Sequence, residues 1–346
     1  MSSKIGKELL SLMKRQNTHD DSVILYFEVS LMRRHIFYTV ITGILIPSLL
    51  ISLVLRLSSR GEDKETNTQI TEPGNPVEEN YVRVQTDEGV VTMALEAYIT
   101  CVVLGEMPSD FESEALKAQA VVARTYTCNR KQTPKHTASD VCTDSTCCQA
   151  FYGEDDYLAS GGSKSFLERV KEAVNQTDGQ VLTYQGKIIE ATYFSCSGGK
   201  TEDAAAVWGS DIPYLQSVDS PGEEMATHYT DTVHFSGDEF RNHLDLPDGG
   251  IKIGNIMYTD GGGVRELTVN GIKFTGTQLR KLLNLRSTAF VITVMGESVT
   301  VTTKGFGHRV GMSQYGAEAM ALQGKSYQDI LSHYYVGTML SSLDFG

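Results

Sequence analysis

The sequence predicts an α+β domain in which a mixed or antiparallel sheet with flanking helices surrounds a central cleft, preceded by one transmembrane helix. Helical periodicity recurs at residues 112–128, 314–323 and 327–335, and hairpin turn signals cluster between these segments. Strand and helix patterns do not alternate as they do in βαβ proteins. With 346 residues, 40% of them hydrophobic, the chain can bury one or two cores.

Residues 36–55 predict a membrane anchor. They form a run of twenty residues without a charge, which is about the length that crosses a bilayer as a helix. A cleaved signal peptide is the alternative, but the run is long for such a peptide and no Ala-x-Ala cleavage site follows it. Anchoring is therefore the favoured interpretation.

The charge around this run predicts its orientation. Residues 1–35 contain six Lys and Arg against four Asp and Glu, and Arg33 and Arg34 border the run. Positive flanks stay in the cytoplasm, so we expect a single-pass protein of the cell membrane whose C-terminal part lies outside the cytoplasm. The net charge of −13 disfavours nucleic acid as a partner. Met32 would by itself begin a conventional anchored protein, so residues 1–31 could precede the true start.

Residues 56–80 predict a flexible linker, because Ser, Glu, Asn, Thr, Pro and Gly dominate them and no apolar periodicity is present. The exported domain then comprises residues 81–346. Its turn signals predict hairpins at residues 87–89, 185–186 and 270–271 and around Gly296.

A helix that ends on a carboxylate is expected near the start of this domain. Leu95, Ile99 and Val102 follow the 3.6-residue spacing of a helix, and Glu106 falls beside the same apolar stripe before Pro108 ends the helix. Desolvation favours the protonated form of a carboxyl group, as a general acid requires. Ser109 is predicted to cap the next helix, with Glu112 three residues on. A glutamate in the last turn of a helix is more often a boundary residue than a catalyst.

Two further blocks are rich in small and polar residues. Residues 305–317 read GFGHRVGMSQYGA, and residues 191–201 read ATYFSCSGGKT before the lone tryptophan, Trp208. Glycines at this density allow the backbone to approach a ligand closely.

Together with residues 95–126, these blocks resemble the stage II sporulation protein D family, which are peptidoglycan lytic transglycosylases. The resemblance runs from about residue 81 to residue 337. Glu106, in the context Gly-Glu-Met-Pro, matches the catalytic glutamate of the family, and this implies a central glycan-binding cleft. Arg309 and Cys196 depart from the family pattern, which commonly has a small residue and a serine there. The positions that match the glycan contacts of the family are Gln119, Arg124, Tyr126, Tyr193, Ser195, Ser197, Gly198, His308, Ser313, Gln314 and Tyr315.

The resemblance implies cleavage of the bond between N-acetylmuramic acid and N-acetylglucosamine to give 1,6-anhydro ends. Glu106 would first protonate the leaving oxygen and then accept the proton of the C6 hydroxyl, so that no second carboxylate is needed. The resemblance also implies action during forespore engulfment in sporulation. The substrate would be glycan strands stripped of stem peptides by a partner amidase, and other engulfment membrane proteins would be partners.

A cluster of metal-binding residues lies just past the second helix. His136, Cys142 and Cys148 recur every six residues, and Cys147 could face away or supply a fourth ligand. Imidazole and thiolates are typical zinc ligands, so we predict a structural zinc ion. Disulfides are the alternative, for example with Cys128, because the exported part of the chain can be oxidised.

Two other functions remain open from the sequence. A non-catalytic glycan-binding scaffold of the cell-wall machinery could use the same cleft, and a zinc amidase or peptidase could use the cysteine cluster. The chain contains no phosphate-binding loop, His-Glu-x-x-His helix or dinucleotide-binding fingerprint, and no organic cofactor is predicted.

Overall fold

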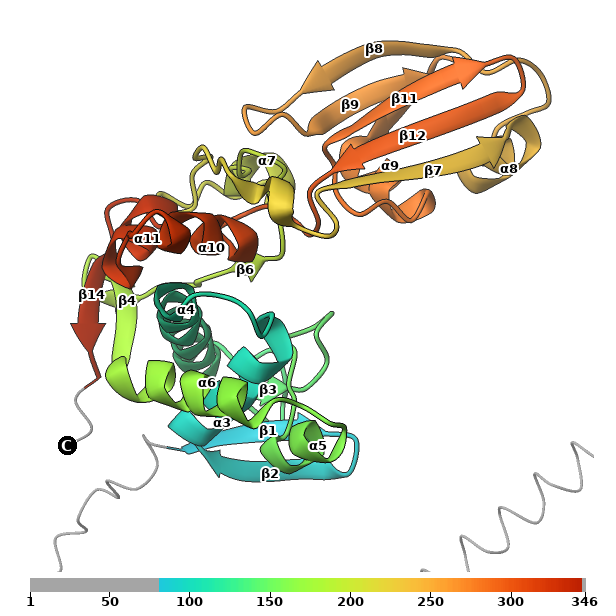
Figure 1. Ribbon diagram of the computed structural model, residues 1–346. Helices are drawn as coiled ribbons and strands as arrows, with labels where there is room; N and C mark the ends of the chain where they lie inside the picture. Colours follow the sequence, from blue (N-terminus) through green and yellow to red (C-terminus); the bar gives the residue numbers. More distant parts are fainter. Residues whose placement is uncertain (1–80, 344–346) are drawn as a thin grey trace, which may run out of the picture. The chain divides into compact units, whose positions relative to one another are not determined.

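A computed structural model describes residues 81–343 of the protein (Figure 1). The predicted cytoplasmic segment 1–35, the alternative start at Met32, the membrane anchor 36–55 and the linker 56–80 lie outside the described residues. Within residues 81–343, no helix combines the length and the apolar composition needed to cross a membrane.

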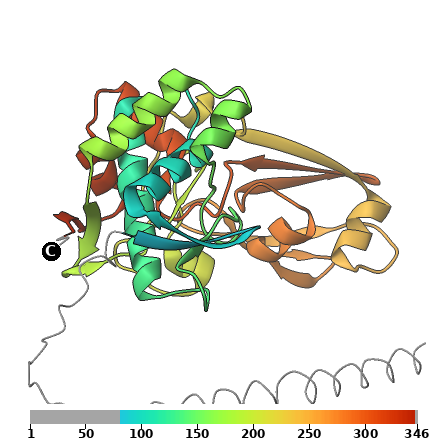
Figure 2. The same cartoon turned by 90° about the horizontal axis from the view of Figure 1, so that it is seen from below.

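The first hydrophobic core forms around helix α4, which is buried along most of its length. Helices α3, α6, α10 and α11 and strand β4 all contact α4 (Figures 1 and 2). Small residues such as Ala115, Ala118 and Ala123 allow this close packing, because they are fully buried and add little volume. The helices of this core are α3 (Leu95–Glu106), α4 (Ser113–Gln132), α5 (Glu154–Ala159), α6 (Lys164–Gln176), α7 (Ala204–Trp208), η2 (Glu223–Met225), α10 (Gln314–Leu322) and α11 (Tyr327–Tyr334).

Three small sheets accompany these helices. Their orders are β2-β1-β3, β14-β4-β5 and β13-β6, and the last pairs two short strands in parallel. The pairing of β13 with β6 brings together the two glycine-containing blocks of the sequence. The strands are β1 (Tyr81–Thr86), β2 (Gly89–Ala94), β3 (Val141–Cys142), β4 (Gln180–Tyr184), β5 (Lys187–Ile188), β6 (Tyr193–Phe194), β13 (Met312–Ser313) and β14 (Met339–Ser342).

Residues 230–304 build a second hydrophobic core of their own. Two antiparallel sheets, of orders β10-β9-β8 and β11-β12-β7, bury Leu267 and Val299 against Phe240 of α8 and Leu279 of α9. The elements are β7 (Thr230–Ser236), α8 (Gly237–Leu244), β8 (Ile253–Tyr258), β9 (Val264–Val269), β10 (Ile272–Thr275), α9 (Gly276–Leu282), β11 (Phe290–Met295) and β12 (Ser298–Lys304).

The predicted hairpins are confirmed. Asn270 and Gly271 both have positive φ, as a two-residue hairpin turn between β9 and β10 requires. The α+β class is confirmed, but the single mixed sheet is wrong, because the described residues form five sheets of two or three strands. The predicted cap at Ser109 is also wrong: α4 begins at Ser113, with Glu112 in the N-cap position.

Candidate functional site

Glu106 lies at the end of α3, where three donors converge on its half-buried carboxylate. The Ala150 N–H donates to Oε1 at 2.7 Å, and the Tyr193 hydroxyl donates to the same oxygen at 2.9 Å. The Gln314 amide donates to Oε2 at 3.1 Å. Helix α3 ends here because Met107, which precedes proline, is extended. Segments far apart in the sequence thus meet at one carboxylate.

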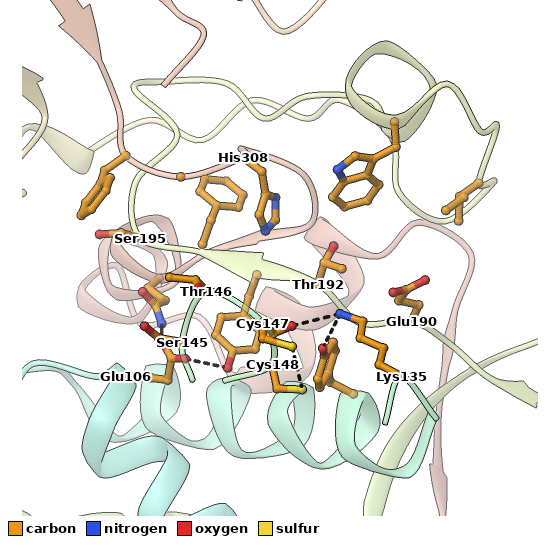
Figure 3. A pocket seen from close by; sticks show the side chains of 18 of the residues that line it. Glu106, Lys135, Ser145, Thr146, Cys147, Cys148, Glu190, Thr192, Ser195 and His308 are labelled. Atoms are coloured by element: carbon orange, nitrogen blue, oxygen red, sulfur yellow. Dashed lines mark hydrogen bonds between the residues drawn. The ribbon is translucent and has the colours of Figure 1, made fainter. Parts of the chain in front are cut away.

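A cleft of about 830 Å³ opens beside Glu106 (Figure 3). Figure 3 places Glu106 at one end of the cleft and Lys135 and Glu190 at the other, with His308 on the opposite wall. Aromatic and hydroxyl side chains make up most of the lining, and a few charged side chains lie among them. The residues are Glu106, Tyr126, Lys135, Ser145, Thr146, Cys147, Cys148, Glu190, Thr192, Tyr193, Phe194, Ser195, Trp208, Ser210, Ile212, Phe306, Gly307, His308 and Gln314.

The glycine-rich loop forms one wall because glycines let it pass close to the β6 segment. A Cβ at Gly311 would lie 2.0 Å from the Thr192 carbonyl oxygen, and one at Gly305 would lie 2.7 Å from the Cys196 carbonyl oxygen. Both glycines have positive φ, which side chains disfavour. The density of glycines seen in the sequence therefore serves close packing of loop against strand.

His308 projects from this loop between two aromatic rings, those of Phe194 and Trp208, with centroid separations of 5.6 and 5.4 Å. Its Nδ1 accepts the Val310 N–H at 3.1 Å, so a neutral imidazole carries its proton on Nε2. Burial, and next the positive charge of Arg280, lower the pKa of His308 to about 4. His308 is therefore a neutral hydrogen-bonding group at physiological pH.

This lowered pKa predicts an acid-sensitive stability. The imidazole has a pKa near 6.5 in the unfolded chain, so its contribution is complete above pH 6.5 and is lost as the pH falls toward 4. We expect the free energy of unfolding, relative to that of His308→Gln, to fall by about 2–3 kcal/mol between pH 7 and pH 4. Urea unfolding of both proteins across this range measures it, and parallel pH dependences would contradict it.

Six of the predicted site residues line the cleft together. Tyr126 comes from α4, Tyr193 and Ser195 from β6 and its following turn, and His308 and Gln314 from the C-terminal block; they share the cleft with Glu106. The other six predicted contacts, which are Gln119, Arg124, Ser197, Gly198, Ser313 and Tyr315, are not among its lining residues.

Ser197 and Gly198 bind a buried carboxylate instead of facing the cleft. Glu223 is fully buried in η2, and its oxygens accept the backbone N–H groups of both residues and the Ser197 hydroxyl. The Ser220 hydroxyl also donates to it at 2.5 Å. Glu223 therefore shapes the turn that follows Ser195. Local sequence patterns did not indicate this role, because Ser197 and Gly198 lie 26 and 25 residues away from Glu223 in the chain.

Three other predicted glycan contacts do not line the cleft either: Ser313, Tyr315 and Gln119. The Ser313 hydroxyl caps α10 by accepting the Gly316 N–H, and the Tyr315 ring packs edge-on against Phe111 at 5.0 Å. Gln119 is fully buried in α4, and its amide nitrogen and oxygen have no hydrogen-bond partner among the described residues. We have no physical account of this buried amide.

The prediction that Arg124 contacts the glycan does not agree with the structure, because its guanidinium is fully buried and does not line the cleft. Glu96 accepts from it at 2.7 and 2.5 Å, and the Gln180 and Val174 carbonyls accept two further N–H groups. A buried guanidinium must be paired in this way, since desolvation of an unpaired charge is costly. Arg124 joins α4 to α3 and β4 and is not available to a glycan.

We therefore expect Arg124→Gln to affect stability and not substrate affinity. Glu96 remains partly solvated, so the loss should be about 3 kcal/mol in the free energy of unfolding, at the lower end for a broken buried pair. Lys171→Gln, which breaks a partly exposed pair with Glu154, is the control and should change stability by less than about 1 kcal/mol. Urea denaturation compares the two, and equal effects would contradict the assignment.

The structure adds charged cleft residues that the sequence did not single out. Glu190 forms an ion pair with Arg130, and the Lys135 ammonium donates to the Tyr126 hydroxyl and the Cys147 carbonyl oxygen. Lys135 directly precedes His136, the first residue of the metal-type cluster formed by His136, Cys142, Cys147 and Cys148. Glu190 directly precedes the block of residues 191–201. No local periodicity distinguishes either from an ordinary surface charge.

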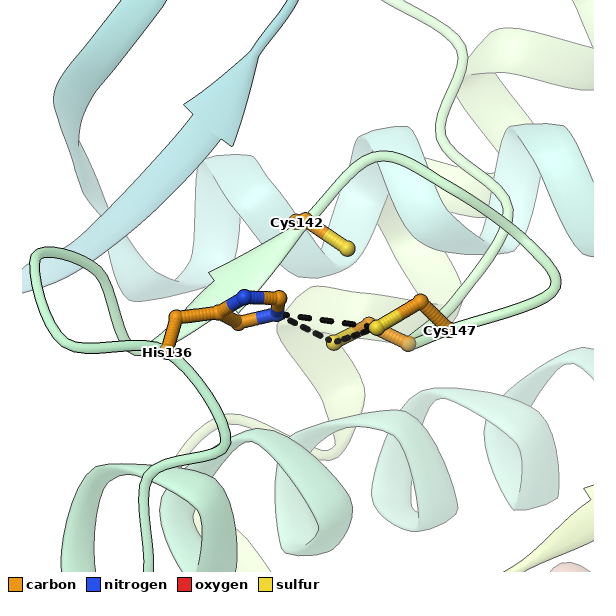
Figure 4. Close-up of side chains that lie close together, drawn as sticks. His136, Cys142 and Cys147 are labelled. Atoms are coloured by element: carbon orange, nitrogen blue, oxygen red, sulfur yellow. Dashed lines mark hydrogen bonds between the residues drawn. The ribbon is translucent and has the colours of Figure 1, made fainter.

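The four residues of the predicted metal site lie close together in the structure. One ligand atom from each of His136, Cys142, Cys147 and Cys148 lies within 4.8 Å of the others (Figure 4). His136 Nε2 lies 3.5 Å from Cys148 Sγ and 3.7 Å from Cys147 Sγ, and the two sulfurs are 4.0 Å apart. A tetrahedral zinc ion places such atoms about 3.5–3.8 Å apart. The distances that join His136, Cys147 and Cys148 are close to these values, and Cys142 Sγ lies within 4.8 Å of the other ligand atoms, so the donor set suits that ion with Cys147 as a fourth member.

The cysteines of this structure are not paired in disulfides. All six cysteines lie within the described residues, and each has a free thiol. Cys147 and Cys148 also line the cleft, so the cluster and the cleft share a wall.

The chain is similar to proteins of sporulation. A family model described as Stage II sporulation protein matches residues 85–184. The chain is similar to Stage II sporulation protein D of Bacillus subtilis (strain 168), with 39% identity over 268 residues that cover 75% of this chain and 77% of that protein. The same protein of Bacillus amyloliquefaciens is 41% identical over 267 residues, with the same coverage of 75% and 77%.

A second kind of relative is named amidase enhancer. This Bacillus subtilis (strain 168) protein is 29% identical over 299 residues, which cover 70% of this chain and 40% of that protein. The segment matched by the family model contains both Glu106 and the cluster of His136, Cys142, Cys147 and Cys148.

Proposed function

The chain belongs to the stage II sporulation protein D family, and from this premise we propose that it is a lytic transglycosylase that cleaves the bond between N-acetylmuramic acid and N-acetylglucosamine in peptidoglycan. The single observation that supports this reaction most is the carboxylate of Glu106, held at the end of a cleft by donors from three other segments. The only other carboxylate among the lining residues of this cleft, Glu190, is paired with Arg130 at the opposite end (Figure 3).

In the proposed reaction, the Glu106 carboxyl donates its proton to the glycosidic oxygen while the bond from that oxygen to C1 of N-acetylmuramic acid breaks. The resulting carboxylate accepts the proton of the C6 hydroxyl as the C6 oxygen bonds to C1, which closes the 1,6-anhydro ring. The proton is returned, no water is consumed, and one carboxyl performs both steps. Hydrolysis by two carboxylates would instead require a second group near the same bond.

The contacts of Glu106 suggest which oxygen exchanges the proton. The Ala150 N–H can only donate, so Oε1 remains an acceptor throughout. Gln314 faces Oε2, and its amide offers both a donor and an acceptor, so half a turn of this amide accommodates the protonated carboxyl. Oε2 is therefore the oxygen we assign to proton transfer.

The other lining residues are suited to a sugar chain. The rings of Trp208 and Phe306 offer apolar faces, and neutral His308 has an Nε2–H donor for a hydroxyl or acetamido group. Neutrality matters here because a charged imidazole would be costly in this half-buried position.

The cellular role is part of the same proposal. An anchor at residues 36–55 would hold the domain on the outer side of the cell membrane, and the enzyme would act during forespore engulfment. The names of the relatives support a link to sporulation and to amidases. We infer that the substrate is glycan stripped of stem peptides by a partner amidase, with other engulfment membrane proteins nearby.

We further propose that the metal-type cluster holds a structural zinc ion. His136, Cys142, Cys147 and Cys148 would be its ligands, and the ion would bind the three thiolates and hold the loop that lines the cleft. The protein's own loop, and not the ion, supplies the cleft surface in this assignment.

Mass spectrometry of the products tests the reaction. The purified protein is incubated with glycan strands that lack stem peptides, and 1,6-anhydro-muramic acid ends are expected. Reducing ends would mean hydrolysis and a second carboxylate, with Glu190 the first candidate. Unchanged strands that nevertheless bind would favour a scaffold, and released amines that vanish on chelation would favour a zinc amidase.

A further inference from the structure

The end of the cleft opposite Glu106 carries a lysine ammonium that has no ion-pair partner among the described residues. Lys135 donates to the Tyr126 hydroxyl at 3.1 Å and to the Cys147 carbonyl oxygen at 3.0 Å, and both acceptors are neutral. Its ammonium also lies 5.6 Å from the centre of the Tyr126 ring. An ammonium has three N–H donors, so one remains for a ligand. Figure 3 shows this ammonium turned into the cleft.

The neighbouring charges do not cancel this cation. Arg130 approaches the same Tyr126 ring, with 5.1 Å from its guanidinium carbon to the ring centre, but Arg130 is paired with Glu190. The side chains of Lys135, Arg130 and Glu190 together carry a net charge of +1, and the one carboxylate among them is engaged by Arg130. Among the described residues, no carboxylate forms an ion pair with Lys135.

We propose that Lys135 forms a subsite for a carboxylate carried by the bound glycan, and that this carboxylate is the free lactyl group of muramic acid. This inference rests on the proposed function. A lactyl group bears a carboxylate only when no stem peptide is attached to it, so the subsite would favour stripped strands. A fixed cation is needed because the chain has a net charge of −13 and would otherwise repel such an anionic polymer.

The anchoring of Lys135 makes the subsite specific. A lysine side chain loses considerable conformational freedom when a ligand orders it, but this one is already held by a hydroxyl, a carbonyl and an aromatic face. The same loop continues into His136, Cys142 and Cys147, so the position of Lys135 depends on the fold of the cluster.

Equilibrium binding tests the subsite without requiring cleavage. Dissociation constants are measured in the Glu106→Gln protein for three forms of the same strand: stripped, stripped with lactyl carboxylates converted to methylamides, and peptide-bearing. We expect Lys135→Gln to weaken binding of the stripped strand about 5- to 20-fold and to leave methylamide binding unchanged. Lys135→Arg should retain most of the affinity, and Lys187→Gln, an exposed lysine outside the cleft lining, is the control.

Each outcome decides the assignment. Equal losses on stripped and methylamide strands, or no loss on either, would overturn it, as would the absence of measurable binding to all three. A loss on peptide-bearing strands as large as on stripped ones would assign the carboxylate to the peptide and overturn the lactyl assignment. Charge-dependent binding without anhydro products would uphold the subsite while the proposed reaction fails, so the two failures are distinguishable.

Discussion

Glu106→Gln is expected to lower the rate of strand cleavage by at least ~10²–10⁴-fold, because an amide can neither donate nor accept the proton that the reaction transfers. The fold should survive the substitution. The new amide oxygen can accept the Ala150 N–H and the Tyr193 hydroxyl, and the new amide nitrogen can face Gln314 after the latter turns.

Product analysis and urea unfolding of the same preparations measure the two effects. Glu168→Gln removes an exposed carboxylate from α6 and should leave both the rate and the stability at wild-type values. A folded Glu106→Gln protein that still produces 1,6-anhydro ends would rule out the mechanism.

Removal of the zinc ion that we propose for this cluster is expected to have the second large effect. Without the ion, nothing would bridge the side chains of His136, Cys142, Cys147 and Cys148, whose ligand atoms lie within 4.8 Å of one another. Structural zinc sites contribute directly to folding free energy. We expect at least about 4 kcal/mol of lost stability, which corresponds to a fall in Tm of about 10 °C for a domain of this size.

Metal analysis and calorimetry before and after chelation measure this effect. Cys142→Ser should reproduce it and should also weaken cleavage, because Cys147 and Cys148 line the cleft. Cys101→Ala, a buried cysteine of α3 outside the cluster, should retain the metal. A zinc content near zero per chain in protein purified without chelators would contradict the zinc assignment.

Much of the local structure could be predicted from the sequence because it depends on neighbouring residues. The turn at Asn270 and Gly271 requires positive φ, which these residues tolerate, and Pro108 prevents α3 from continuing. The cluster of His136, Cys142 and Cys148 was also visible, since its ligands lie within thirteen residues of the chain.

Side chains on one helix show where such prediction stops. Arg124 and Tyr126 are two residues apart in α4 and both were predicted to bind glycan, yet Tyr126 lines the cleft and Arg124 pairs with Glu96 in the interior. Helical periodicity separates the faces of a helix, but it does not say which neighbour covers each face.

By itself, the sequence determined the four helices of residues 95–106, 112–128, 314–323 and 327–335 to within a few residues, the hairpins, the spacing of the cysteine cluster and the position of Glu106 at the end of a helix. Only the tertiary structure decided that Ala150, Tyr193 and Gln314 donate to Glu106, that Glu223 shapes the turn after Ser195, and that Lys135 faces the cleft. The reason is physical: secondary structure follows from short-range sterics and hydrogen bonds, whereas the charges and donors of a site are brought together by packing between segments that are distant in the chain.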